Sequence, residues 1–166
     1  ELTAPEVKDK GEEIGIDLVG IADCETIAEN PPPGEHQPDP ENVLYGAASL
    51  VVIGRRATYG ASTRDWNNRN AHHSKQIGLK ELESDALELL YFLEDHGYPS
   101  TMVPAESARS RQYDQMDGGP FSLPHAAVEA GLGTLGLNLQ LLTPEFGPRV
   151  ILGGIVTTAE LEPDGK

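Results

Sequence analysis

The chain has 166 residues, which is enough for one domain with its own hydrophobic core. It carries 12 Lys and Arg against 27 Asp and Glu, a formal net charge of −15. Binding nucleic-acid phosphates takes a basic surface, so we do not expect nucleic acid as a main partner. No apolar run is long enough to cross a bilayer, and the first residues lack the features of a signal peptide. We therefore expect a cytoplasmic protein without membrane association.

The hydrophobic pattern predicts alternating helices and strands in the first part of the chain. The clearest helix covers 72–96, where leucines recur at a spacing of three to four residues and Gly97 follows. The clearest strand is the apolar run 49–54. The remaining predictions here are helices over 4–15 and 41–48, a buried strand over 16–22, a proline-rich loop over 29–42 and a polar loop over 55–71.

In the second part of the chain, the hydrophobic pattern predicts mainly strands. A short strand is expected over 100–105, a polar loop over 106–120, and a short helix from Pro124 to about Glu129. Two further strands, 138–143 and 149–158, flank the turn sequence 144–148, which favours a tight connection between them. We expect residues 1–166 to form one domain of the α+β class, an α/β sandwich without an internal repeat.

A glycine-rich stretch follows the expected short helix. Gly131, Gly133 and Gly136 reproduce the spacing G-x-G-x-x-G, which is found in dinucleotide-binding proteins. The stretch follows a helix and not a strand, and no Lys-Ser or Lys-Thr pair follows Gly136, so neither a dinucleotide site nor a phosphate loop is favoured. Glycines at this spacing let backbone approach a flat ligand or a neighbouring helix closely.

Histidine and cysteine give little support for a metal site. No H-x-x-x-H or H-E-x-x-H spacing exists, so we predict no mononuclear metal site. Among the five histidines only His125, on the expected short helix, is kept as a candidate site residue. The single cysteine, Cys24, can form neither an internal disulfide nor a four-cysteine zinc or iron–sulfur site.

The segment 112–121 places a tyrosine and two aspartates beside a Gly-Gly-Pro turn. An Asp in a tight loop is most often a turn former or a cap. A Tyr and an Asp held next to a pocket could equally supply a proton-donor pair. On residue pattern alone, both interpretations of Tyr113 and Asp117 remain open.

The stretch "AVEAGLGTLGLNLQLLTPEFGPRVILGGIVTTAELEPD", residues 127–164, resembles one shared by corrinoid-dependent reductive dehalogenases and epoxyqueuosine reductases. Upstream, "IGIDLVGIA", "ASLVVIG" and a long helix ending in "LEDHGY" occur in the same order as in that superfamily. The resemblance implies a nitroreductase-like fold, in which a central mixed sheet flanked by helices holds cobalamin in its base-off form. It covers nearly the whole chain and is strongest after residue 120.

The resemblance also implies roles for individual residues. Asp117, in the sequence Asp-Gly-Gly-Pro, occupies the place of an aspartate that resembles a catalytic acid in epoxyqueuosine reductases. Reductive dehalogenases use a tyrosine as donor, for which Tyr113 or Tyr59 could serve. The expected cofactor-binding residues are Gly131, Leu132, Gly133, Leu135, Gly136, Leu137, Asn138, Leu141, Thr143 and His125, with Leu139 packing beside them.

Three departures from the superfamily pattern affect what is expected. Leu137 stands where a basic residue is usual, and Thr157-Thr158 replaces a Thr-Asp pair. The superfamily continues into a ferredoxin-like module with two four-cysteine clusters, and one cysteine cannot hold a 4Fe-4S cluster. We therefore expect electrons from a ferredoxin-like partner, either on a separate chain or in a missing module.

The leading functional hypothesis is a cobalamin-binding domain of a reductase that cleaves a carbon–halogen or carbon–oxygen bond of a small-molecule substrate. Within it, we lean toward the dehalogenase-like branch. The alternatives are a non-catalytic corrinoid carrier and a nitroreductase-like protein that binds FMN, whose phosphate could contact Arg55, Arg56, Arg64 and Arg69. The sequence is also compatible with a homodimer.

Overall fold

The structure is a computed structural model and describes residues 2–30, 39–60, 68–103 and 122–165. Its centre is a four-stranded sheet with the order β1-β2-β6-β3. The strands are β1 (Leu18–Asp23), β2 (Ser49–Arg56), β6 (Val150–Thr157) and β3 (Ser100–Val103). Every pairing among them is antiparallel. The α+β sandwich is confirmed, but the expected mixed sheet is wrong for these strands.

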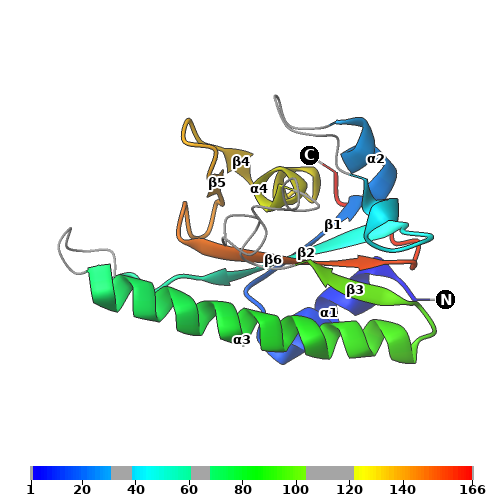
Figure 1. The fold of residues 1–166 in the computed structure, drawn as a ribbon, viewed down its shortest axis with the longest axis horizontal. Coiled ribbons are helices and arrows are strands. Elements are labelled where there is room, and N and C mark those ends of the chain that lie inside the picture. The colour runs from blue at the N-terminus through cyan, green and yellow to red at the C-terminus, as the bar shows by residue number, and fades with distance from the viewer. Residues whose placement is uncertain (1, 31–38, 61–67, 104–121, 166) are drawn as a thin grey trace.

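Two helices cover one face of the sheet. α1 (Ala4–Ile14) and α3 (Asn68–Asp95) pack on this face, and α3 runs along the sheet and past its end (Figure 1). The leucines that predicted α3 do face the core, since Leu82, Leu89 and Leu93 are fully buried. Although α3 runs for 28 residues, neither it nor another helix in the described ranges is apolar enough to cross a membrane.

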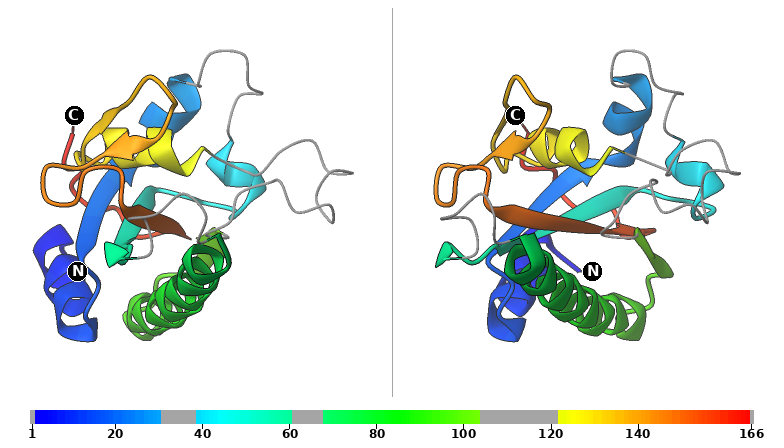
Figure 2. Two further views of the ribbon diagram at one scale, coloured as in Figure 1. Left: turned by 90° about the vertical axis from the view of Figure 1, so that its left-hand side faces the viewer. Right: turned by 60° about the vertical axis from the view of Figure 1, so that its left-hand side comes forward.

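Shorter elements cover the opposite face (Figure 2). They are α2 (Cys24–Glu29), α4 (Leu123–Glu129) and a small hairpin of β4 (Thr134–Leu135) and β5 (Leu141–Leu142). Successive residues of β2 alternate between two cores: Val51 and Ile53 belong to the core that includes residues of α1 and α3, whereas Leu50 and Val52 belong to the core that includes residues of α4. A strand buried on both faces has a continuous apolar sequence, which explains why 49–54 was easy to identify.

Two expectations about secondary structure are wrong, and one helix was not expected. The expected helix over 41–48 is only a 3-10 turn, Pro40–Asn42, because the chain turns at Gly46 with a φ of 76°. α2 was not expected, and Asp23 caps it by accepting a hydrogen bond of 2.8 Å from the Thr26 N–H.

The expected pairing of 138–143 with 149–158 is also wrong. β5 pairs with β4, whereas β6 joins the central sheet. The turn between them closes on itself, since the Thr143 N–H donates to the Gly147 carbonyl at 3.0 Å and the Gly147 N–H donates to the Thr143 carbonyl at 2.9 Å. The turn sequence was therefore identified correctly, but the chain leaves it toward a different partner.

Candidate functional site

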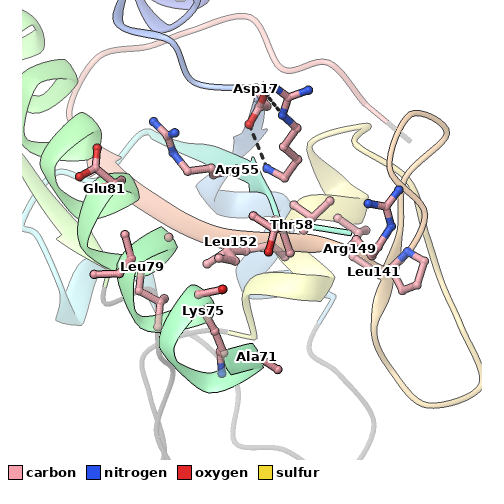
Figure 3. Close-up of a pocket in the computed structure, with 18 of the residues that line it drawn as sticks. Asp17, Arg55, Thr58, Ala71, Lys75, Leu79, Glu81, Leu141, Arg149 and Leu152 are labelled. Atoms are coloured by element: carbon pink, nitrogen blue, oxygen red, sulfur yellow. Dashed lines mark hydrogen bonds and ion pairs between the residues drawn. The ribbon is translucent and has the colours of Figure 1, made fainter. Parts of the chain in front are cut away.

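A pocket of about 930 Å³ opens at one end of the sheet. The end of β2 and the start of β6 form its centre, the first half of α3 forms one wall, and α4 and β5 contribute the other (Figure 3). Its volume is that of a site for a large organic ligand.

The pocket has an apolar floor and a charged rim. Leu79, Leu141 and Leu152 form the floor, and charged side chains surround it. Four basic residues line the pocket together with two carboxylates, although the whole chain has 12 Lys and Arg and a charge of −15. The basic residues are Arg55, Arg56, Lys75 and Arg149, and the acidic residues are Asp17 and Glu81. The pocket therefore concentrates positive charge in an acidic protein.

Arg55 is fixed by an ion pair with α3. Its guanidinium contacts the carboxylate of Asp85, whose side chain is 13% exposed. This hydrogen bond is the main cause that raises the pKa of Arg55, so the residue stays charged. The Nε atom of Arg55 is buried and has no hydrogen-bond partner among the described residues. Arg55 therefore stabilises the contact between β2 and α3 as well as lining the pocket.

Arg56 is held more loosely, by Asp17. Its backbone N–H donates to the Asp17 carboxylate at 2.9 Å, and its Nε atom lies 3.6 Å from the other carboxylate oxygen. The Arg56 side chain is 69% exposed. An exposed pair of this kind contributes little stability, so its guanidinium can turn toward a ligand at low cost.

Arg149 is positioned by an aromatic ring. Its guanidinium carbon lies 5.2 Å from the ring centre of Tyr59, a cation–π contact. Its carbonyl accepts a hydrogen bond of 2.8 Å from the Ala57 N–H, which ties the start of β6 to the end of β2. Tyr59, which was predicted as a proton donor, is 69% exposed, and its ring lies against the guanidinium of Arg149. Its catalytic role stays a prediction.

The glycine-rich stretch has a different explanation from the one expected. A Cβ at Gly133 would lie 2.2 Å from the Leu142 carbonyl oxygen, and one at Gly131 would lie 2.7 Å from the Gly165 carbonyl oxygen. At Gly136 a Cβ would meet the Asn138 side chain at 3.1 Å. The close approach that we expected toward a flat ligand or a neighbouring helix is therefore made here toward the chain itself. Cofactor binding by these glycines stays a prediction.

Among the other residues expected to bind the cofactor, only Leu141 lines the pocket. Leu132 packs against β1 at Gly20, Leu135 lies in β4, and Thr143 accepts a hydrogen bond of 3.1 Å from the Phe146 N–H within the turn.

The hairpin tip projects away from the core. Leu137 is completely exposed and Leu139 is 66% exposed. The Asn138 amide donates to the Gln140 side chain at 2.8 Å. A cofactor role for these residues is a prediction that no contact within the described chain supports.

The proton-donor candidates upstream of α4 lie mostly outside the described residues. Tyr113 and Asp117 belong to 104–121, which the structure does not describe; along the chain this segment leads to Leu123, which lines the pocket. His125 does not line the pocket, and its Nδ1 atom is 3.0 Å from the Ser122 Oγ.

Sequence reasoning missed Lys75 and Arg149 as site residues. The only basic cluster visible in the sequence was Arg55, Arg56, Arg64 and Arg69. Of these, the first two line the pocket, Arg69 does not, and Arg64 lies outside the described residues. Arg149 is far from the cluster in sequence, and only the pairing of β2 with β6 brings it near Arg56. Covariation between position 149 and a position in this cluster would have been the signal needed to identify Arg149.

Cys24 is buried at the start of α2, and burial raises the pKa of its thiol to about 12, so the thiol is neutral. A 4Fe-4S cluster takes four cysteine ligands, and the sequence has one. An iron–sulfur cluster therefore does not fit the residues of this chain.

No protein-family profile matches the chain. Among curated proteins, it is 26% identical over 182 residues to the epoxyqueuosine reductase of Bacillus anthracis, an alignment that covers 91% of this chain and 43% of the relative. The chain thus spans less than half the length of the curated relatives that it matches along most of its sequence.

Solved structures share the fold. An epoxyqueuosine reductase crystallised with an epoxyqueuosine-modified tRNA-Tyr stem loop matches with a TM-score of 0.64 and 20% identity, over 97% of this chain and 46% of that one. A reductive dehalogenase whose structure suggests a mechanism for B12-dependent dehalogenation matches with a TM-score of 0.64 and 19% identity, over 96% and 21%. An epoxyqueuosine reductase from Bacillus subtilis, described with its catalytic aspartate loop swung out of the active site, gives 0.63 and 19%, over 97% and 46%.

These likenesses bear on two expectations. They confirm the α+β fold that the sequence resemblance implied. We expected nucleic acid to be unlikely as a main partner, whereas one structural neighbour was crystallised with a tRNA stem loop. The alternative cofactor, FMN, is not mentioned in the description of any of the structures named above.

Proposed function

We propose that this chain, a member of the superfamily that contains the epoxyqueuosine reductases and the reductive dehalogenases, is a cobalamin-binding domain of a reductase. The observation that carries this proposal is the pocket, with its apolar floor, its polar rim and its volume of about 930 Å³. The likeness to a structure associated with B12-dependent dehalogenation supports it.

The residues of the pocket fit a corrinoid. A corrin ring is broad and largely apolar, its edge is fringed with amide groups, and the nucleotide loop of cobalamin carries one phosphate. Leu79, Leu141 and Leu152 offer an apolar surface, and Gln140 offers an amide for the fringe. The same rim carries guanidinium groups that suit a phosphate.

Bound cobalamin would supply a strongly reducing and nucleophilic cobalt centre, and the protein would supply orientation and protons. In our proposal Asp117 donates a proton to the leaving oxygen or to the carbon freed from its halogen. The catalytic aspartate loop described for the Bacillus subtilis enzyme supports this role. A carboxyl group does this at neutral pH only if its surroundings keep it protonated.

The substrate class is the finer part of the proposal. The matching curated relatives are named epoxyqueuosine reductases, which favours a carbon–oxygen bond in a modified RNA base over the carbon–halogen bond toward which the sequence leaned. The basic rim of the pocket is compatible with an RNA substrate. Electrons would come from a ferredoxin-like partner or module, since this chain cannot hold the clusters itself.

Retention of the cofactor is the first test. The purified protein is incubated with hydroxocobalamin or with FMN, passed through a desalting column and examined by absorption spectroscopy. We expect only the corrinoid bands to stay with the protein. Leu152→Trp, which fills the floor, should lose them, whereas Leu87→Trp on the outer side of α3 should keep them. Loss of the corrinoid by the unmodified protein would refute the proposal, and retention of FMN would support the nitroreductase-like alternative.

Turnover then separates an enzyme from a corrinoid carrier. The cobalamin-loaded protein is given a strong chemical reductant with either an epoxyqueuosine-containing RNA stem loop or a brominated phenol. We expect Asp117→Asn to abolish turnover and to leave cobalamin retention unchanged, while the matched Asp114→Asn variant stays active. Full activity of Asp117→Asn would exclude Asp117 as the proton donor, and no turnover with either substrate would favour the carrier.

A further inference from the structure

We infer that Arg149 is the anion-binding residue of the pocket and that it selects a ligand carrying a phosphate or carboxylate group. The inference rests on the proposed function only for the identity of that ligand. It concerns a residue that the sequence analysis did not single out.

The first observation is the state of each guanidinium. Arg55 forms a close ion pair with the nearly buried carboxylate of Asp85, and the exposed Arg56 forms a weaker ion pair with Asp17. Within the described part of the chain, no carboxylate forms an ion pair with Arg149. In a chain with 27 acidic residues, an arginine in a pocket without a carboxylate partner retains its full capacity to bind an anion.

The second observation is that Arg149 is held in place without being neutralised. The Tyr59 ring orients the guanidinium through a cation–π contact at 5.2 Å. The backbone of Arg149 is fixed on both sides, since its carbonyl accepts from Ala57 at 2.8 Å and its N–H donates to the Phe146 carbonyl at 3.3 Å. A guanidinium that is already ordered loses less conformational entropy when it binds an anion.

The third observation is the electrostatic setting. Asp17 and Glu81 also line the pocket, and their negative charges repel an anion that binds there. Arg56 and Arg55 lie beside them and offset that charge, since Arg56 pairs with Asp17 and Glu81 interacts electrostatically with Arg55. Lys75 adds a further positive charge from α3. The apolar floor then receives the uncharged body of the ligand, so the pocket suits an anion attached to a large apolar group.

Two sources of the anion are compatible with this chemistry. One is the phosphodiester in the nucleotide loop of cobalamin, and the other is an anionic group on the substrate. Dicyanocobinamide lacks the nucleotide loop and its phosphate, so it separates the two. Benzoate serves as a probe for a carboxylate on a small aromatic body, and inorganic phosphate as a probe for the anion alone.

The test compares Arg149→Gln with the unmodified protein by titration calorimetry against hydroxocobalamin, dicyanocobinamide, benzoate and inorganic phosphate. A charge-assisted hydrogen bond corresponds to about a 10- to 100-fold change in affinity. We expect a loss of that size for hydroxocobalamin with none for dicyanocobinamide if the cofactor supplies the anion. A loss confined to benzoate and phosphate would assign the site to the substrate.

Arg69→Gln is the matched control, because it removes the same charge from an exposed position of α3 that does not line the pocket. Its affinities should equal those of the unmodified protein. Arg149→Lys keeps the charge without the planar fork and should recover part of the lost affinity. Unchanged affinity of folded Arg149→Gln for all four probes would overturn the inference.

The outcomes also separate this inference from the proposed function. If the unmodified protein retains no corrinoid but binds benzoate or phosphate through Arg149, the cofactor assignment fails and the anion site stands. If corrinoids bind equally to the unmodified protein and to Arg149→Gln, and the two anions bind to neither, the cofactor assignment stands and the anion site is refuted.

Discussion

The β4–β5 hairpin and the pocket at the end of the sheet differ in how visible they are in the sequence. The hairpin carries the conspicuous motif, yet its glycines make room for the chain's own backbone at Leu142 and Gly165. The pocket carries the chemical groups, yet it is assembled from β2, α3, α4, β5 and β6 without a contiguous motif. A glycine motif therefore reports close packing, and only the surroundings tell whether the packing partner is a ligand.

Replacing Gly133 should give the largest effect and tests the structural role of the hairpin. In Gly133→Ala the new Cβ would lie 2.2 Å from the Leu142 carbonyl oxygen, and backbone has little freedom to move away. We expect the free energy of unfolding to fall by about 2–3 kcal/mol in urea denaturation. Gly60→Ala is the control, since no atom of the described residues lies within 4 Å of its Cβ. Equal stability of the two variants would show that the hairpin tolerates a side chain, which would reopen the ligand interpretation.

Asp85→Asn tests the pocket side of the comparison and should have an intermediate effect. The substitution weakens the contact that holds Arg55, whose Nε has no other partner in the described part of the chain. We expect a loss of about 1–3 kcal/mol in the free energy of unfolding. Asp95→Asn, at an exposed position at the end of α3, should change it by less than about 0.5 kcal/mol. If both variants matched the unmodified protein, Arg55 would have no structural role.

Leu139→Gly should give the smallest effect, and it should be stabilising. Leu139 has a φ of 61°, in the left-handed region that costs a non-glycine residue about 1 kcal/mol. Glycine relieves that cost, so the free energy of unfolding should rise by about 0.5–1 kcal/mol. The neighbouring Leu137→Gly, which has no such strain, should lower it slightly. A decrease for Leu139→Gly would mean that its exposed side chain makes a stabilising contact.

The sequence predicted the layers of this fold better than its connections. α3 and β2 were placed within a few residues because periodic leucines and a continuous apolar run are local signals. The partner of β5 was not predicted although it is close in the sequence, because β4 is only two residues long and lies in a glycine-rich stretch without an alternating strand pattern. Arg55 and Arg56 were noticed as neighbours in sequence, whereas Arg149 joined them only through the register of β2 and β6.

One contact at the far side of the sheet has a consequence for solubility. β1 is an edge strand of the described sheet, and its residue Ile21 is contacted by Asp164 twice. The Asp164 carboxylate accepts from the Ile21 N–H at 2.8 Å, and the Asp164 N–H donates to the Ile21 carbonyl at 2.9 Å. Lys8 of α1 holds the same carboxylate. A single aspartate thus occupies the place of a neighbouring strand, so it blocks the edge along which another chain could add and nucleate aggregation.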